Sequence, residues 1–375
     1  MTHACNTPLR WKNYIINKGV NVCTFWEDHL ADKARNLLFI MGQGFDPRMC
    51  NGATTILKQG GEGLRNCLLI EYDEGPESPS IKYADLVEKN RLLLNELFGE
   101  ENLEVRKLQM LSDDGRRIGS IRASYLVRDI NELKSYTDII IDISAIPRGI
   151  YFPLVAKILQ LIDNSEKKEP INLHVVVTED IELDKRIQEE GIDEEIMYLP
   201  GFSRDLVSNE GMPKVWIPVL GEGKLAQMKN LFQNINADEI CPVIPSPSID
   251  PRRGDNLLLE YRELLLDSTL VEPRNIIYAS EQNPFEAYRE MYQAVVRYND
   301  TLAILGGCRT VISILSSKLL SIGALLASYE LKFANKYEIC VAHIEAQGYN
   351  MSNVRDLTGK EELFTLWLAG ECYEE

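Results

Sequence analysis

Residues 138–149 read Asp-Ile-Ile-Ile-Asp-Ile-Ser-Ala-Ile-Pro-Arg-Gly and lead directly into the apolar stretch 150–162. A short run of β-branched residues that stops at Ser and Pro predicts a buried strand, and the stretch after it predicts a helix. A strand that is apolar at nearly every position, rather than at alternate ones, is typical of a parallel sheet covered by helices on both faces. This stretch therefore predicts an α/β fold.

The same alternation of strand and helix continues along the chain. We expect strands at 36–41, 67–72, 104–110, 138–143 and 171–177 in the first half, and at 215–220, 239–244, 275–279, 310–315 and 338–344 in the second. Helices fit 83–97, 150–162, 223–234, 255–266, 284–298 and 319–331. Residues 120–127 fit a strand or a helix, and the acidic stretch 179–195 fits a solvated helix.

The composition argues against several classes of protein. The 375 residues include 40 Lys and Arg against 57 Asp and Glu, a net charge of −17, which argues against an extended surface for duplex DNA. No apolar window approaches the roughly 20 residues of a membrane-spanning helix, so we expect no membrane partner and a cytoplasmic protein. Eight cysteines stand singly and only four histidines are present, so we expect no metal cluster and no cofactor.

Two uncommon patterns each occur once in each half, in the same order. An apolar strand runs into Asp46-Pro47-Arg48 in the first half, and another runs into Asp250-Pro251-Arg252 in the second. A strand that ends in Ser144 and leads through Arg148 into a helix is matched by one that ends in Ser316. The repetition favours two Rossmann-like lobes with mainly parallel sheets, related by internal duplication. The expected division is an N-terminal segment 1–35, lobe 1 at 36–205, lobe 2 at 206–350 and a C-terminal helix or tail at 351–375.

The candidate ligand site lies where these strands end. In an open parallel sheet, ligands bind beyond the carboxyl ends of the strands, where helices begin with free N–H groups and a positive dipole. Hydroxyl groups and cations at these ends predict a site for a small anion, most simply a nucleotide. The candidate binding residues are Arg48, Ser144, Arg148, Arg252, Arg253, Arg309, Ser316, Ser317 and Lys318.

Each of these features also has a structural interpretation. Asp-Pro-Arg is an ordinary turn, and Ser before an apolar helix is an ordinary N-cap. The candidates for an acid, a base or a magnesium ligand are Asp46, Asp142, Asp250, His343 and Glu345, but no clear nucleophile, base or metal triad can be assembled from them. The residues alone therefore do not decide whether the protein is an enzyme.

The strand at 139–144, which turns through Pro147 and Arg148 into a helix, resembles the ligand-loop motif of CARF-type sensor domains. Those domains carry an Asp-Ile-(Thr/Ser)-Gly-Gly-Thr-Lys-like turn, whereas Ala145-Ile146-Pro147 replaces the glycines here. The duplicated layout is similar to that of SAVED domains, which are fused pairs of CARF-like lobes that bind cyclic oligonucleotides in bacterial antiviral systems. The resemblance implies a Rossmann-like nucleotide sensor.

Three functional hypotheses follow from these patterns. The leading one is a sensor or regulatory subunit, in bacterial antiviral defence, that binds a nucleotide-like anion in a crevice between the two lobes. The second is a hydrolase or transferase that acts on a nucleotide, NAD or a sugar phosphate. The third is an interaction subunit whose acidic surface and N-terminal segment, residues 11–30, dock a partner protein encoded nearby.

Overall fold

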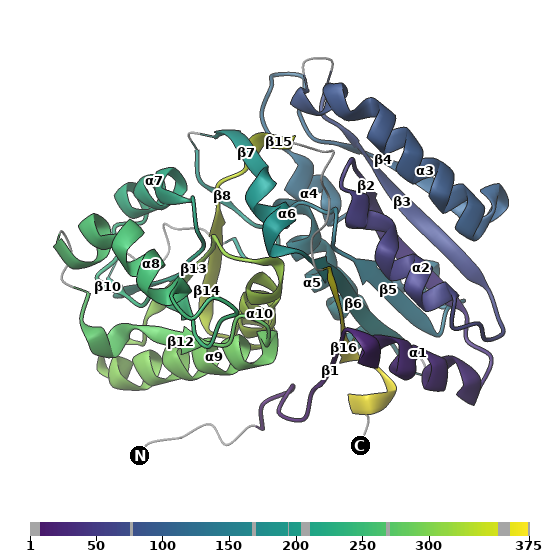
Figure 1. The fold of residues 1–375 in the computed structure, drawn as a ribbon. Helices are drawn as coiled ribbons and strands as arrows, with labels where there is room; N and C mark the ends of the chain where they lie inside the picture. Colours follow the sequence, from purple (N-terminus) through teal and green to yellow (C-terminus); the bar gives the residue numbers. More distant parts are fainter. Residues whose placement is uncertain are drawn as a thin grey trace. The chain divides into compact units, whose positions relative to one another are not determined.

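The computed structural model describes residues 8–75, 78–166, 170–193, 195–203, 211–267, 271–351 and 361–373 (Figure 1). The chain divides into two compact units. Lobe 1 consists of Tyr14–Gly191 and Ala346–Glu375, and lobe 2 consists of Met1–Asn13 and Ile192–Glu345. Each lobe is an α/β unit built around its own mainly parallel sheet, as the alternating pattern predicts.

The lobe boundaries differ from the predicted ones at both ends of the chain. The predicted N-terminal segment is divided, because the strand β1 (Ile15–Lys18) pairs with β16 (Glu362–Ala369) and so joins lobe 1. The predicted C-terminal helix is wrong for 362–369, where a run of apolar and β-branched residues forms β16. The predicted boundary at residue 205 lies outside the described residues, and the unit division falls at Gly191 and Ile192.

The sheet of lobe 1 has seven strands in the order β1-β16-β6-β5-β2-β3-β4. The remaining strands are β2 (Leu37–Gln43), β3 (Arg65–Asp73), β4 (Leu103–Gln109), β5 (Asp138–Asp142) and β6 (Asn172–Glu179). These five are parallel, whereas β16 runs antiparallel to both β6 and β1. All five residues of β5 are buried, as expected for a central strand that helices cover on both faces.

Helices cover the lobe 1 sheet in two layers. The first layer is α1 (Val20–Asp32), α2 (Asn51–Leu57) and α3 (Ala84–Phe98), whose apolar side chains share one core with β2, β3 and β5. Helix α5 (Arg148–Asp163), described along its whole length, connects β5 to β6 and contributes no side chain to that core, as expected for a right-handed connection that places it on the opposite face. The short helix α4 (Gly119–Ala123) occupies the stretch for which strand and helix were both open.

The acidic stretch after β6 is only partly helical. It forms the helix α6 (Ile181–Arg186) and then the strand β7 (Ile187–Ile192). The strand β7 pairs with β15 (Ala346–Met351) in a two-stranded sheet. The prediction of a single solvated helix is therefore wrong, because a strand partner from near the end of the chain is present.

The sheet of lobe 2 has the order β12-β11-β9-β13-β14-β8, with β10 paired to β9. Its strands are β8 (Met197–Tyr198), β9 (Lys214–Val219), β10 (Glu239–Ile240), β11 (Val243–Pro245), β12 (Ile277–Ala279), β13 (Arg309–Ile314) and β14 (Glu338–His343). All these pairs are parallel except β14 with β8. The helices are α7 (Leu225–Ile235), α8 (Arg253–Glu260), α9 (Pro284–Thr301) and α10 (Lys318–Tyr329).

Both lobes have the same order of parallel strands. In each lobe the first strand (β2 or β9) is central, the second and third lie on one side of it, and the fourth and fifth lie on the other. This is the order of doubly wound sheets and is expected if one lobe was duplicated. The two sequence patterns behave differently, however. The Ser-ending strands β5 and β13 are both fourth in order, whereas Asp-Pro-Arg follows the first strand in lobe 1 and the second strand in lobe 2. The predicted equivalence of the two Asp-Pro-Arg turns is wrong.

Among the described residues, the structure contains no helix with the length and apolar character needed to cross a bilayer.

Candidate functional site

The predicted candidates of lobe 1 gather at one edge of its sheet. The chain runs outward from β2 to β4 and then returns to β5 on the other side of β2. The segments after β2 and β5 therefore diverge, and ligands of doubly wound sheets bind at this switch point. Asp46 and Arg48 follow β2, Asp142 ends β5, and Arg148 begins α5.

Ser144 and Asp142 fix the end of β5. The Ser144 N–H donates to Asp142 Oδ1 at 2.9 Å, and Ser144 Oγ accepts the Thr178 N–H at 2.9 Å. Ser144 is fully buried, so its hydroxyl ties β5 to β6. This geometry supports the structural interpretation of Ser144 over a direct contact with ligand.

The second carboxylate oxygen of Asp142 lies against the start of α2. A Cβ atom on Gly52 would lie 2.3 Å from Asp142 Oδ2, so only glycine fits there. Burial, together with the nearby charge of Asp142, raises the pKa of the Cys50 thiol to about 12. Cys50 is therefore a neutral packing residue. Gly52 was not predicted as part of the site, because its role depends on a residue 90 positions away in the chain.

Arg48 is buried and is engaged by two carboxylates. Its Nη2 lies 2.7 Å from Asp46 Oδ2, and its Nη1 lies 2.8 Å from Asp184 Oδ1 on α6. Asp46 Oδ1 also accepts the Arg48 N–H at 2.9 Å and so caps the turn. Burial lowers the pKa of Arg48, but its hydrogen bonds and charge interactions with Asp46 and Asp184 raise it overall, so the guanidinium stays charged.

Arg148 has a comparable arrangement on the other side of the switch point. Its Nη1 lies 3.2 Å from Oε1 of Glu189 on β7. Burial lowers the pKa of Arg148, and the charge of Glu189 contributes to a net rise. Both predicted cations of lobe 1 are therefore charged, and each contacts a carboxylate of the segment that follows β6.

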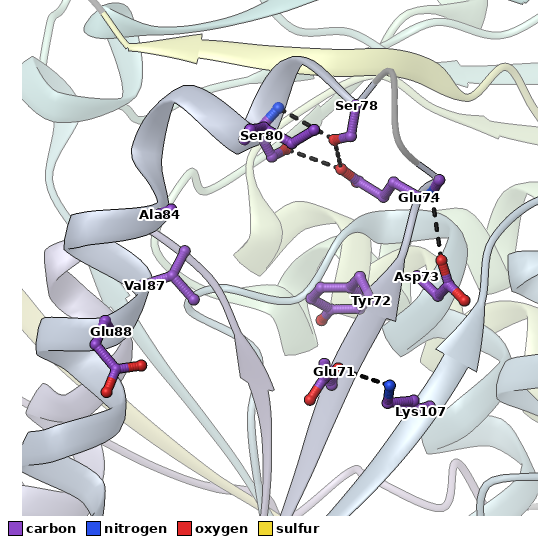
Figure 2. Close-up of a pocket in the computed structure, with 12 residues that line it drawn as sticks. Glu71, Tyr72, Asp73, Glu74, Ser78, Ser80, Ala84, Val87, Glu88 and Lys107 are labelled. Carbon is purple, nitrogen blue, oxygen red and sulfur yellow. Dashed lines mark hydrogen bonds and ion pairs between the residues drawn. The ribbon is translucent and has the colours of Figure 1, made fainter.

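A groove of about 480 Å³ lies beside the switch point, at the end of β3 (Figure 2). It is lined mainly by acidic and hydroxyl side chains: Glu71, Asp73, Glu74, Glu88, Ser78 and Ser80, with Lys107 as the basic residue. Lys107 Nζ lies 3.6 Å from Glu71 Oε1, and the Ser80 hydroxyl donates to Glu74 at 2.9 Å. The groove suits a hydroxyl-bearing or cationic group better than a phosphate.

Tyr72 lies in the wall between the groove and the switch point. Its hydroxyl is buried, has no hydrogen-bond partner among the described residues, and packs against Gly42, where a Cβ atom would lie 2.1 Å away. Burial raises the pKa of Tyr72 well above its ordinary value. The sequence analysis did not single out this groove. The available signal was the acidic end of β3, which alone does not distinguish a groove from a solvated loop.

The structure separates the predicted cations of lobe 2. Arg309 is the first residue of β13 and therefore lies at the amino end of that strand, opposite the predicted ligand edge. Its assignment to the site is wrong, because it was grouped with Ser316 by sequence proximity alone. Lys318 begins α10, and Ser317 is the N-cap, whose Oγ accepts the Leu320 N–H at 3.4 Å.

The Asp250 turn of lobe 2 follows β11, which lies between the edge strand β12 and the central strand β9. Asp250 Oδ1 accepts the Arg252 N–H at 2.9 Å, as in an ordinary turn, and the side chain of Arg252 is exposed. Arg253 forms an ion pair with Glu281, which is almost fully buried, and its Nε lies 3.8 Å from Glu222. Arg253 therefore contacts the loop that follows β9, beside the lobe 2 switch point between β9 and β13, whereas Asp250 and Arg252 belong to the loop after β11.

Ser316, His343 and Glu345 are buried at the carboxyl edge of β13 and β14. His343 ends β14, and Ser316 lies two residues beyond the end of β13. The turn after β9 packs closely here, since a Cβ atom on Gly221 would lie 2.2 Å from the carbonyl oxygen of Leu315. The backbone of the turn after β9 thus packs directly against the end of β13, and lobe 1, with two charged arginines at its switch point, is the better candidate.

A cluster with metal-ligand chemistry lies at the opposite edge of the lobe 1 sheet. The ligating atoms of His29, Asp138 and His174 are buried and lie within 4.8 Å of one another. Asp138 Oδ1 lies 2.7 Å from His29 Nε2 and 3.2 Å from His174 Nε2. Arg35 Nη1 lies 3.4 Å from Asp138 Oδ2, so a cation already faces this carboxylate. We interpret the cluster as a hydrogen-bonded network that joins α1 to the sheet.

The fold and the switch point define the class of doubly wound α/β proteins, in which the ligand edge is the carboxyl edge of the sheet. No family model matches the chain, and no curated protein matches it.

Similar solved structures include the trans-methyltransferase CalH in complex with SAH, at 12% identity over 43% of this chain, with a TM-score of 0.23. That match spans only 36% of the CalH chain. A universal stress protein from Archaeoglobus fulgidus matches at 11% identity, over 82% of this chain and 95% of its own, with a TM-score of 0.23. A SAM-dependent O-methyltransferase from Thermotoga maritima matches at 16% identity, over 48% of this chain and 55% of its own, with a TM-score of 0.21.

Proposed function

We propose that lobe 1 binds a nucleotide-like anion at the switch point between β2 and β5, and that the protein acts as a sensor or regulatory subunit. The observation that carries this proposal is the placement of Arg48 and Arg148 on the two loops that diverge there. Both guanidinium groups have raised pKa values and remain charged. In a chain of net charge −17, a buried Arg48 and a partly buried Arg148 at the ligand edge favour a small anion over a broad polyanion.

The neighbouring groove supports a nucleoside as the rest of this ligand. Its volume of about 480 Å³ is in the range of small-molecule sites, about 300–1,000 Å³. The carboxylates of Glu71 and Asp73 at the end of β3 would accept hydrogen bonds from sugar hydroxyls, whereas the two arginines would hold phosphate. The proposal extends to bacterial antiviral defence through the CARF-like turn at 139–148. A neighbouring gene for a nuclease or a nucleotidyltransferase would support that extension.

Loss of either arginine should weaken nucleotide binding. We expect Arg48→Gln and Arg148→Gln each to reduce affinity by about 10- to 100-fold, since hydrogen bonds to charged groups contribute about 1.5–3 kcal/mol. Isothermal titration calorimetry against a panel of mononucleotides, dinucleotides and cyclic oligonucleotides measures the change. Arg122→Gln is the matched control, because Arg122 is exposed on α4 and carries the same charge. Failure of the wild-type protein to bind any member of the panel would refute the proposal.

Asp142 favours a second candidate function, an enzyme that acts on a nucleotide, NAD or a sugar phosphate. Its carboxylate is buried at the switch point, with one oxygen held by the Ser144 N–H and the other against Gly52. In that case Asp142→Asn should abolish turnover of a labelled nucleotide while ligand affinity stays within about threefold of wild type. Turnover assays on the same ligand panel distinguish the enzyme from the sensor, which gives no product.

The structure weakens the third hypothesis, docking of a partner through residues 11–30. Trp11 and Trp26 are both fully buried within the chain itself. Trp11 packs edge-on against Tyr288, with ring centroids 5.3 Å apart. These aromatic side chains are therefore not available to a partner.

A further inference from the structure

The two switch-point arginines of lobe 1 share one feature that the proposed function does not explain. Each of them contacts a carboxylate from the same short segment, which we call the cover segment, residues 181–192 (α6 and β7). Asp184 on α6 contacts Arg48, and Glu189 on β7 contacts Arg148. One segment therefore places two negative charges on the two cations that flank the switch point.

The two carboxylate partners of Arg48 differ in their distance along the chain and in their exposure to solvent. Asp46 is two residues away in the chain, is largely buried and accepts hydrogen bonds from both the backbone and the guanidinium of Arg48. Asp184 is 136 residues away, and its side chain is 53% exposed. Asp46 therefore orients Arg48 whether or not Asp184 is present. Because ion pairs with an exposed partner are weak, an incoming anion can exchange with Asp184 at little cost.

Among its described residues, the cover segment is anchored by one buried side chain, Leu183, which packs with Tyr83 and Met351, and by one strand pairing. Within the described part of the chain, its strand β7 pairs only with β15, in a two-stranded sheet separate from the main sheet of lobe 1. Isolated two-stranded sheets are marginally stable in water. Local displacement of residues 181–192 therefore leaves the seven-stranded sheet intact.

We infer that the cover segment is an internal anion that occupies the ligand site of lobe 1, and that the natural ligand carries two or more negative groups that replace Asp184 and Glu189. This inference rests on the proposed function, because it assigns the chemical class of ligand to that same site. An oligophosphate engages both arginines at once and releases the segment, whereas a single phosphate engages one arginine and leaves the other paired. The segment lowers the apparent affinity by competition.

The test uses the full chain, with inorganic tripolyphosphate as the multiply charged probe and inorganic phosphate as the singly anchored one. We expect Asp184→Asn to raise the affinity for tripolyphosphate by about two- to fivefold in calorimetric titrations, because Asp184 is half-exposed and its ion pair is weak. Glu189→Gln should raise the affinity at least as much, because the Glu189 side chain is only 14% exposed and its ion pair is less screened. The double variant should show the product of the two gains. Tripolyphosphate should also speed hydrogen exchange in residues 181–192 of the wild-type protein.

Two comparisons separate failure of this inference from failure of the proposed function. Glu195→Gln is the matched control, because Glu195 is an exposed acidic residue of the same stretch, outside the cover segment, and should leave the affinity unchanged. If the wild-type protein binds tripolyphosphate and both variants bind it equally or more weakly, the displacement inference is wrong but the anion site stands. If neither the wild type nor the double variant binds tripolyphosphate but the wild type binds a nucleotide of the panel, the displacement inference is wrong and the proposed function stands. If no nucleotide binds either, both are wrong.

Discussion

Replacing Asp138 by alanine should destabilise lobe 1 by about 3–5 kcal/mol, the usual cost of removing one partner from a buried ion pair. Asp138 is fully buried and is the shared acceptor for two imidazoles, with Arg35 and the Thr137 hydroxyl on its other oxygen. The alanine variant leaves the Arg35 guanidinium buried without this counter-charge. Chemical denaturation followed by hydrogen-exchange mass spectrometry on β5 and β6 peptides measures the loss.

Two variants control for this effect. Asp138→Asn keeps the shape and removes the charge, so it should give an intermediate loss. Asp113→Ala removes an exposed carboxylate from the same lobe and should change the unfolding free energy by no more than about 0.5 kcal/mol. An Asp138→Ala protein as stable as wild type would show that this network does not contribute to the stability of lobe 1.

The same network sets the response of lobe 1 to acid. Burial alone raises the pKa of Asp138, but hydrogen bonds from His174 and His29 bring it well below its ordinary value. Burial lowers the pKa of His174. Both groups are depressed in the folded state, so the unfolded chain takes up their protons first. Stability should fall below about pH 6.5 through His174 and further below about pH 4 through Asp138. The second decline should be smaller in Asp138→Ala, but not absent, because burial raises the pKa of Glu371 in the same lobe while its hydrogen bond with Arg35 helps to lower it overall, to about 2.

Replacing Trp11 by alanine should destabilise lobe 2 by about 3–5 kcal/mol, the usual cost of deleting a buried aromatic side chain. Trp11 is fully buried and packs edge-on against Tyr288 and Tyr329. The neighbouring Arg10 N–H donates to Glu330 at 3.2 Å, and the Arg10 guanidinium lies 4.8 Å from the Trp11 ring. Hydrogen-exchange protection should fall in peptides of α9 and α10.

This prediction also tests the assignment of the N-terminal residues to lobe 2. Protection in β2, β3 and β5 of lobe 1 should stay at the wild-type level in Trp11→Ala. Trp11→Phe keeps an aromatic ring and should lose less stability, and Lys12→Ala, at the adjacent exposed position, should lose little. Equal loss of protection in both lobes would contradict the assignment.

Strands that are marked by a local apolar run and bounding turn residues were predictable from the sequence. Strand β5 contains three successive isoleucines and is followed by Ser and Pro, and the prediction of a buried strand in a parallel sheet was confirmed. Strand β16 has a similar composition, but sequence alone does not reveal that its partners are β1 and β6 from distant parts of the chain. Pairing over such separations depends on tertiary packing and leaves no local pattern.

The sequence also predicted only part of the candidate site, namely its arginines and not their acidic partners on α6 and β7. Arg48 and Arg148 were identified because strand ends meet at one edge of a parallel sheet, which is a rule of topology. Their partners Asp184 and Glu189 were not identified, because an acidic stretch is normally solvated and nothing local joins it to an arginine far away in the chain. Arg309 was wrongly assigned to the site because it lies at the amino end of β13, whereas the ligand edge is formed by the carboxyl ends of the strands.

The position of β16 between β6 and β1 has a consequence for co-translational folding. Lobe 2 is encoded by residues 1–13 and 192–345, so all of it has been translated before β16 emerges. Strand β16 is translated after all of lobe 2, so the nascent lobe 1 lacks this antiparallel strand, and β1 lacks its partner, until residues 362–369 leave the exit tunnel. Because translation runs from the N-terminus, lobe 2 can fold before lobe 1 is complete. Until β16 pairs with it, β6 is an exposed edge strand of lobe 1 and a site where a chaperone can bind.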